Sequence, residues 1–128
     1  MAQLTPDPKP EEKVSEPTVT QEWIDDAAQR YLTNHQGMFT DLTLEIAKQT
    51  MQECAIEFSD LQYCENIIEK RYWLGMSRNW AKMSVGSPDD INTTVIKGLE
   101  RQQWVYGNPI YGATYLYFDN DVLTSYQD

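Results

Sequence analysis

The chain offers few residues whose type and spacing are typical of catalysis. His35 is the only histidine, and its neighbours Asn34 and Gln36 place it at the end of a predicted helix, where an imidazole can donate to free carbonyls. No Glu-x-x-His and no His-x-x-x-His pair occurs, so the helical di-iron and zinc-protease motifs are absent. We therefore expect His35 to be structural, and we predict no metal and no other cofactor.

Two short patterns begin like known sites and then depart from them. Asp119-Asn120-Asp121 starts like a calcium loop, but the glycine and the distal glutamate that such a loop needs are missing. The segment 75–79 starts like the nucleophile elbow of a hydrolase, but Asn79 replaces the second glycine and the pattern around it is helical. No glycine-rich phosphate loop occurs. We predict that the chain is not an enzyme.

Carboxylates spaced four residues apart form a further candidate. Glu53 and Glu57, and likewise Glu65 and Glu69, would share helix faces and could pair for acid–base chemistry. An exposed acidic face is the simpler interpretation, because the formal charge is −10. This charge argues against general affinity for nucleic-acid phosphates and fits a binder of basic partners. One alternative function is an acidic inhibitor that mimics nucleic acid, with these four glutamates as phosphate substitutes.

Residues 70–82 form a local contrast, because they contain four basic residues and no acid. Arginine and tryptophan are the residue types most enriched at binding hot spots, and they can also stack on bases or hold phosphates. Alternatively, the aromatic rings are core and the basic groups snorkel over them. Protein binding, nucleic-acid binding and a core role remain open. The candidate binding residues here are Arg71, Trp73, Arg78, Trp80 and Lys82.

A second candidate surface is rich in tyrosine and lies near the end of the chain. Tyrosine supplies a large contact area at little entropic cost, and its hydroxyl tolerates water. The segment predicts either a lid over the core or an interface. Its candidate partner-binding residues are Trp104, Tyr106, Tyr111, Tyr115 and Tyr117.

The elements that must position these residues are predicted to be mostly helices. Thr18 or Thr20 can cap a first helix that ends between Asn34 and Gly37. Thr40 or Asp41 can cap a second helix. An apolar stripe with helical spacing then runs onward to about residue 83, and it predicts packing against other helices or a partner. Its first members are Leu44, Ala47, Met51, Cys54, Phe58 and Leu61.

The segment 86–90 is the strongest boundary signal. Ser87 can cap and Pro88 can occupy the first position of a last long helix, which would bury Ile91, Val95 and Leu99 and end near Trp104. Residues 111–118 are β-like in composition. We predict a mainly α fold, a small bundle of about four helices with a short β-like C-terminal segment. The predicted domains are a disordered or extended tail over 1–17 and one helical domain over 18–128.

Cys54 and Cys64 are the only cysteines, and both fall in or beside the apolar stripe. On a continuous helix a ten-residue spacing corresponds to about 15 Å, far beyond disulfide reach. We therefore expect two reduced thiols and a cytoplasmic protein, or one within a virion or other assembly, with no membrane segment. The predicted function is a non-enzymatic interaction or assembly protein, a small accessory subunit of a larger bacterial or phage complex. It would bind a protein partner or itself, and nucleic acid is an unlikely partner.

Overall fold

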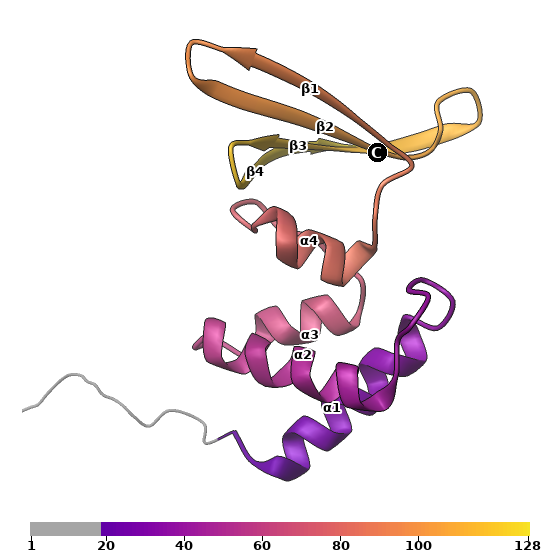
Figure 1. Ribbon diagram of the computed structural model, residues 1–128, viewed down its shortest axis with the longest axis vertical. Coiled ribbons are helices and arrows are strands. Elements are labelled where there is room, and N and C mark those ends of the chain that lie inside the picture. The colour runs from indigo at the N-terminus through magenta and orange to yellow at the C-terminus, as the bar shows by residue number, and fades with distance from the viewer. Residues whose placement is uncertain (1–18) are drawn as a thin grey trace, which may run out of the picture. The chain divides into compact units, whose positions relative to one another are not determined.

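The computed structural model describes residues 19–128, so the predicted tail over 1–17 lies outside the described residues. The described chain contains four helices and a four-stranded antiparallel sheet (Figure 1). The prediction of a mainly α bundle is therefore wrong, because the fold is mixed α/β. The described residues divide into two compact units, 19–65 and 66–128, and each is described by itself. A single domain over 18–128 stays a prediction.

The first unit, hereafter the helical unit, contains α1 (Gln21–Asn34) and α2 (Leu44–Glu57). The predicted cap at Thr20 is confirmed, because its side chain accepts a hydrogen bond of 3.0 Å from the N–H of Trp23. Thr43, rather than Thr40 or Asp41, caps α2 by accepting from the N–H of Ile46. Both caps satisfy a backbone donor that would otherwise lack a helical partner. Helix α3 (Gln62–Ile68) begins in this unit and runs past its end.

The core of the helical unit contains residues of both α1 and α2. Tyr31 is buried, as are the predicted stripe residues Ala47, Met51 and Cys54. Leu44 begins the same stripe but is 36% exposed, because it lies in the first turn of α2. The small residues of α1 that are fully buried, Ala27 and Ala28, leave room for a neighbouring helix to approach closely. The part of the stripe from Ala47 to Cys54 therefore packs within the helical unit.

A disulfide joins Cys54 and Cys64, whose Cα atoms lie 5.9 Å apart. The expectation of two reduced thiols is therefore wrong. It assumed a continuous helix, whereas α2 ends at Glu57 and Phe58 is extended, with φ −113° and ψ 120°. The chain reverses over residues 58–61 before α3 begins, and this reversal brings the two cysteines together.

The second unit, hereafter the sheet unit, follows α3 with helix α4 (Arg78–Val85) and four strands. The strands are ordered β1-β2-β3-β4, and each pairs antiparallel with its neighbour in the sequence. Helix α4 lies against one face of this sheet (Figure 1). The strand bounds are β1 (Asp90–Ile96), β2 (Leu99–Asn108), β3 (Gly112–Asp119) and β4 (Val122–Gln127).

The predicted last helix over 88–104 is wrong, because this segment forms the β1–β2 hairpin. Ile91, Val95 and Leu99 are four residues apart, but the residues among them are largely β-branched, which favours a strand. Lys97 and Gly98 have φ values of +51° and +82°, as a two-residue hairpin turn of type I′ requires. The predicted β-like segment over 111–118 is confirmed, since nearly all of it lies in β3.

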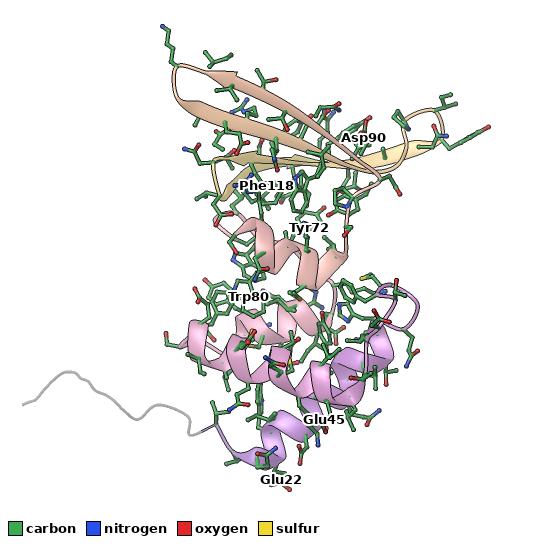
Figure 2. All side chains as sticks on the ribbon, viewed as in Figure 1. Glu22, Glu45, Tyr72, Trp80, Asp90 and Phe118 are labelled. Atoms are coloured by element: carbon green, nitrogen blue, oxygen red, sulfur yellow. A yellow bond between two sulfur atoms is a disulfide. The ribbon has the colours of Figure 1, made fainter. Side chains whose placement is uncertain are left out.

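The core of the sheet unit lies between the sheet and α4. Trp104 from β2, Leu116 and Phe118 from β3, and Leu123 from β4 are each at most 1% exposed. Trp104 and Phe118 pack with their ring centroids 4.5 Å apart. Figure 2 shows Phe118 on the side of the sheet that faces α4. None of the helices in residues 19–128 is long and apolar enough to cross a membrane.

Candidate interaction site

The two faces of the sheet carry different side chains. Because side chains alternate along a strand, the residues between the core positions point away from α4. The strand register places Gln103 opposite Tyr117, and Val105 opposite Tyr115, on this second face. No helix of the sheet unit covers it (Figure 1). We call it the open face.

A groove of about 530 Å³ lies on the open face. Amide, carboxylate and phenol groups dominate its walls, and none of the described residues that line it is basic. Its acidic residues, Asp89 and Asp90, come from the start of β1 and the residue before it. The groove can therefore accept hydrogen bonds from a ligand and stack against flat groups. The residues that line it are Asp89, Asp90, Asn92, Gln103, Val105, Gly107, Pro109, Tyr115, Tyr117 and Gln127.

A row of hydrogen bonds holds the polar side chains of the groove across three strands. The amide nitrogen of Asn92 donates to the amide oxygen of Gln103 at 2.9 Å. The amide nitrogen of Gln103 in turn donates to the hydroxyl of Tyr117 at 3.2 Å. At the edge of the groove, the carboxylate of Asp89 accepts from the N–H of Gly107 at 2.7 Å. These contacts fix the orientation of the groups, which lowers the entropy cost of binding.

An ion pair lies beside this row on the same face. Arg101 makes two hydrogen bonds to the carboxylate of Asp119, at 2.7 and 2.9 Å. These bonds hold the pKa of Asp119 below its ordinary value and raise the pKa of Arg101. Arg101 is exposed and Asp119 is half-buried, so the pair remains in contact with solvent and contributes to orientation more than to stability.

The turn between β2 and β3 carries two exposed apolar side chains. Ile110 is 83% exposed and Tyr111 is 86% exposed. The turn is ordered by Asn108, whose side-chain oxygen accepts from the N–H of Ile110 at 2.9 Å. Pro109, in the same turn, lines the groove. The turn therefore presents an apolar tip directly beside the polar groove.

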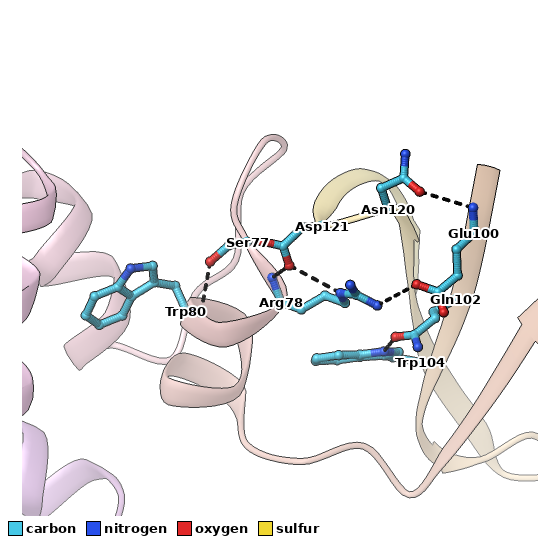
Figure 3. A network of polar contacts seen from close by, with 8 residues as sticks. All are labelled: Ser77, Arg78, Trp80, Glu100, Gln102, Trp104, Asn120 and Asp121. Atoms are coloured by element: carbon cyan, nitrogen blue, oxygen red, sulfur yellow. Dashed lines mark hydrogen bonds and ion pairs between the residues drawn. The ribbon is translucent and has the colours of Figure 1, made fainter. Parts of the chain in front are cut away.

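The predicted basic and aromatic surface is largely used within the sheet unit. Arg78 contacts Asp121 at 3.2 Å and Glu100 at 3.1 Å (Figure 3). The amine of Lys82 lies 5.9 Å from the centroid of the Trp104 ring, which is buried. Trp104, which was predicted in the second, tyrosine-rich surface, is therefore part of the core of the sheet unit. Two cations of the predicted surface already have partners within the chain, so the geometry does not favour binding to phosphates.

The other residues of the predicted set lie in varied settings. Trp80 is buried, Trp73 is half-buried, and Arg71 is exposed in the segment before α4. The hydroxyl of Tyr106 donates to the carbonyl of Gly86 at 2.8 Å, and burial raises the pKa of Tyr106. Of the ten predicted residues, the structure places Tyr115 and Tyr117 in the groove and Tyr111 beside it.

Two candidates from the helical unit are structural in their setting. His35 is fully buried, stacks on Tyr31 with centroids 3.9 Å apart, and contacts the carbonyl of Tyr31 through Nδ1 at 2.8 Å. Glu65 does not continue a row with Glu53 and Glu57, because α2 ends before it. Glu65 instead accepts two hydrogen bonds from Arg30, at 2.8 and 3.0 Å. This arrangement does not favour regular spacing of phosphate substitutes.

Several groove residues were not predicted from the sequence. Asn92 and Asp90 were assigned to a helix, and Gln103 and Gln127 have no distinctive spacing. Only the pairing of Asn92 with Gln103 across β1 and β2 brings these groups together. The Lys97-Gly98 dipeptide between two runs of strand-forming residues was the available signal for that pairing.

Comparison with protein families, with curated proteins and with solved structures gives no match for this chain. Within residues 19–128, no group of three or more His, Cys, Asp or Glu side chains is arranged to hold a metal ion.

Proposed function

We propose that this chain is a protein-interaction protein that binds a partner protein on the open face of its sheet. The single observation that carries the proposal is the groove whose Asn92, Gln103 and Tyr117 side chains are already linked by hydrogen bonds. Tyrosine and amide groups of this kind can contact peptide groups directly or through water. The role of accessory subunit in a larger complex stays a prediction.

The chemistry around the groove narrows the surface that would fit it. Asp89 and Asp90 supply carboxylates, so the partner contributes hydrogen-bond donors or basic side chains at that end. At the same end of the sheet, Ile110 and Tyr111 in the turn after β2 offer exposed apolar area that can anchor a contact. A polar groove beside an apolar anchor is typical of a surface for a folded protein partner.

The test compares two tyrosines of the same sheet. Tyr115→Ala removes a ring from the groove, whereas Tyr126→Ala removes a tyrosine that pairs with Leu116 on the opposite face. A partner identified with the full chain is titrated against both variants by calorimetry. Removal of a hot-spot tyrosine costs about 2 kcal/mol, which is roughly a 30-fold loss of affinity. Equal affinity of wild type and Tyr115→Ala would contradict the proposal.

The disulfide changes the proposed location. We infer that the protein works in an oxidising environment, since bridges such as Cys54–Cys64 persist there and are rare in the cytosol. This inference replaces the cytoplasmic prediction and remains compatible with a place on a virion surface. Alkylation of free thiols during lysis of the native source, followed by mass measurement, tests it. Alkylation of both cysteines without prior reduction would contradict the inference.

A further inference from the structure

The two edges of the sheet differ in what covers them. At the β4 edge, the backbone of Leu123 already pairs with residues 75–76, which precede α4. Its carbonyl accepts from the N–H of Gly75 at 2.8 Å, and its N–H donates to the carbonyl of Met76 at 2.9 Å. Tyr72 adds a ring contact to Tyr126 at 5.0 Å. This edge is therefore partly closed by the sheet unit itself.

Within residues 19–128, no backbone segment pairs with the β1 edge in this way. All seven residues of β1 are exposed, and the strand pairs only with β2. Natural proteins commonly protect an open edge with charges, prolines or bulges. Between Asp90 and Lys97, β1 has none of these: the six intervening residues are Ile, Asn, Thr, Thr, Val and Ile. An uncharged, β-branched edge of this kind is suited to pairing with another strand.

The register determines which backbone groups face outward from β1. The carbonyl of Glu100 accepts from the N–H of Asn120 at 2.7 Å, so the backbone of Glu100 is directed toward β3. Val95, which lies opposite Glu100, is therefore a non-hydrogen-bonded position of the β1–β2 ladder. Because such positions alternate, the N–H and C=O groups of Ile91, Thr93 and Val95 point to the open edge.

These three residues suit antiparallel pairing with themselves. When the two-fold axis passes through Thr93, Ile91 of one copy lies opposite Val95 of the other, and all three outward residues form ladder pairs. A shift of the axis by one residue leaves one of the three without a pair. Just beyond the paired residues, Lys97 in the turn after β1 of each copy lies at the same end of the contact as Asp89, the residue before β1 of the second copy, so opposite charges flank the contact.

We propose that two copies of this chain pair through their β1 edges and form one continuous antiparallel sheet around a two-fold axis at Thr93. The contact is isologous and closed, because the two β1 edges occupy each other. The proposed dimer depends on the β1 edge alone and does not require the proposed binding groove. It would also bring the Asn92 walls of two grooves to the same axis, so that one partner surface could contact both.

The first test measures the mass of the full chain in solution by light scattering during gel filtration. We expect twice the chain mass of 14.9 kDa. Thr93→Pro removes the central outward N–H while leaving the ladder with β2, so it should give the monomer mass with an unchanged circular-dichroism spectrum. Thr93→Val keeps the N–H and should remain dimeric. A monomeric wild type, a larger assembly that grows with concentration, or a dimer that survives Thr93→Pro would overturn the proposal.

A second test reports the register and does not depend on the proline variant folding. In the proposed register two Thr93→Cys side chains face each other across the axis, at the Cα separation of about 5.5 Å that suits a disulfide. The native cysteines are already bridged, so mild oxidation should give a covalent dimer that reductant reverses. Thr124→Cys, at an exposed position of β4, is the matched control and should stay monomeric on a denaturing gel. Equal cross-linking of both variants would contradict the β1 contact.

Discussion

Loss of the Cys54–Cys64 bridge should destabilise the helical unit by a predictable amount. The bridge joins residues ten apart in sequence, and closing a loop of that length restricts the unfolded chain by about 3 kcal/mol at 25 °C. The double variant Cys54→Ala/Cys64→Ala removes this stabilisation. With a urea dependence of roughly 1–3 kcal/mol per molar, the unfolding midpoint should fall by roughly 1–3 M. The helical circular-dichroism signal measures it, because α1 and α2 provide most of the helical residues.

Reduction of the wild type provides the matched control for this variant. Reductant should lower the midpoint of the wild type to near that of the variant, and it should leave the variant unchanged. Detection of two free thiols in the unfolded, unreduced protein would show that the bridge is absent and would refute the reasoning. An unchanged midpoint after complete reduction would refute the assigned stabilisation.

Three further perturbations test the sheet unit. Leu116→Ala empties a position that is 1% exposed and should cost about 2–5 kcal/mol in urea unfolding, whereas Val122→Ala, at 46% exposure, should cost much less. Gly98→Val should destabilise the sheet unit by about 1–2 kcal/mol in the same assay, because the φ of +82° at this position disfavours a β-branched side chain. None of the described residues would clash with the new Cβ atom, so a smaller loss would show that the turn relaxes. Burial, together with the hydrogen bond to Asp128, raises the pKa of Tyr72 to about 12, above its ordinary value of 10. The folded state therefore holds this proton more tightly, and its contribution to stability should be lost as the pH rises from 10 to 12. Phenolate absorbance measures the titration, Asp128→Asn should lower this pKa, and ionisation of every tyrosine near pH 10 would contradict the assignment.

The sequence was informative where local signals agreed. For α1, the cap at Thr20 and the end near His35 both follow from residue types at the two ends of one helix. The signals conflicted over β1, where the four-residue spacing of Ile91 and Val95 imitates a helix face although the residues between them favour strands. The helical spacing predicts a helix there, whereas the Lys97-Gly98 turn indicates a hairpin.

The candidate site was predicted only in part for a different reason. Tyr115 and Tyr117 stood out by composition alone, without any knowledge of their neighbours. Asn92 and Gln103 are eleven positions apart and become partners only through the register of a hairpin. The disulfide was missed likewise, because it depends on where α2 stops, at Glu57, and not on the spacing of the cysteines.

The nearest-neighbour order of the strands has a consequence for how the sheet forms. Every strand pairs with the one that follows it in the chain, across connections of only a few residues. Sheets with such local pairing assemble quickly, since little loop entropy must be lost before contacts form. Oxidation of two thiols takes seconds to hours. During synthesis and maturation, the Asn92–Gln103–Tyr117 row should therefore be assembled well before the cysteine bridge closes.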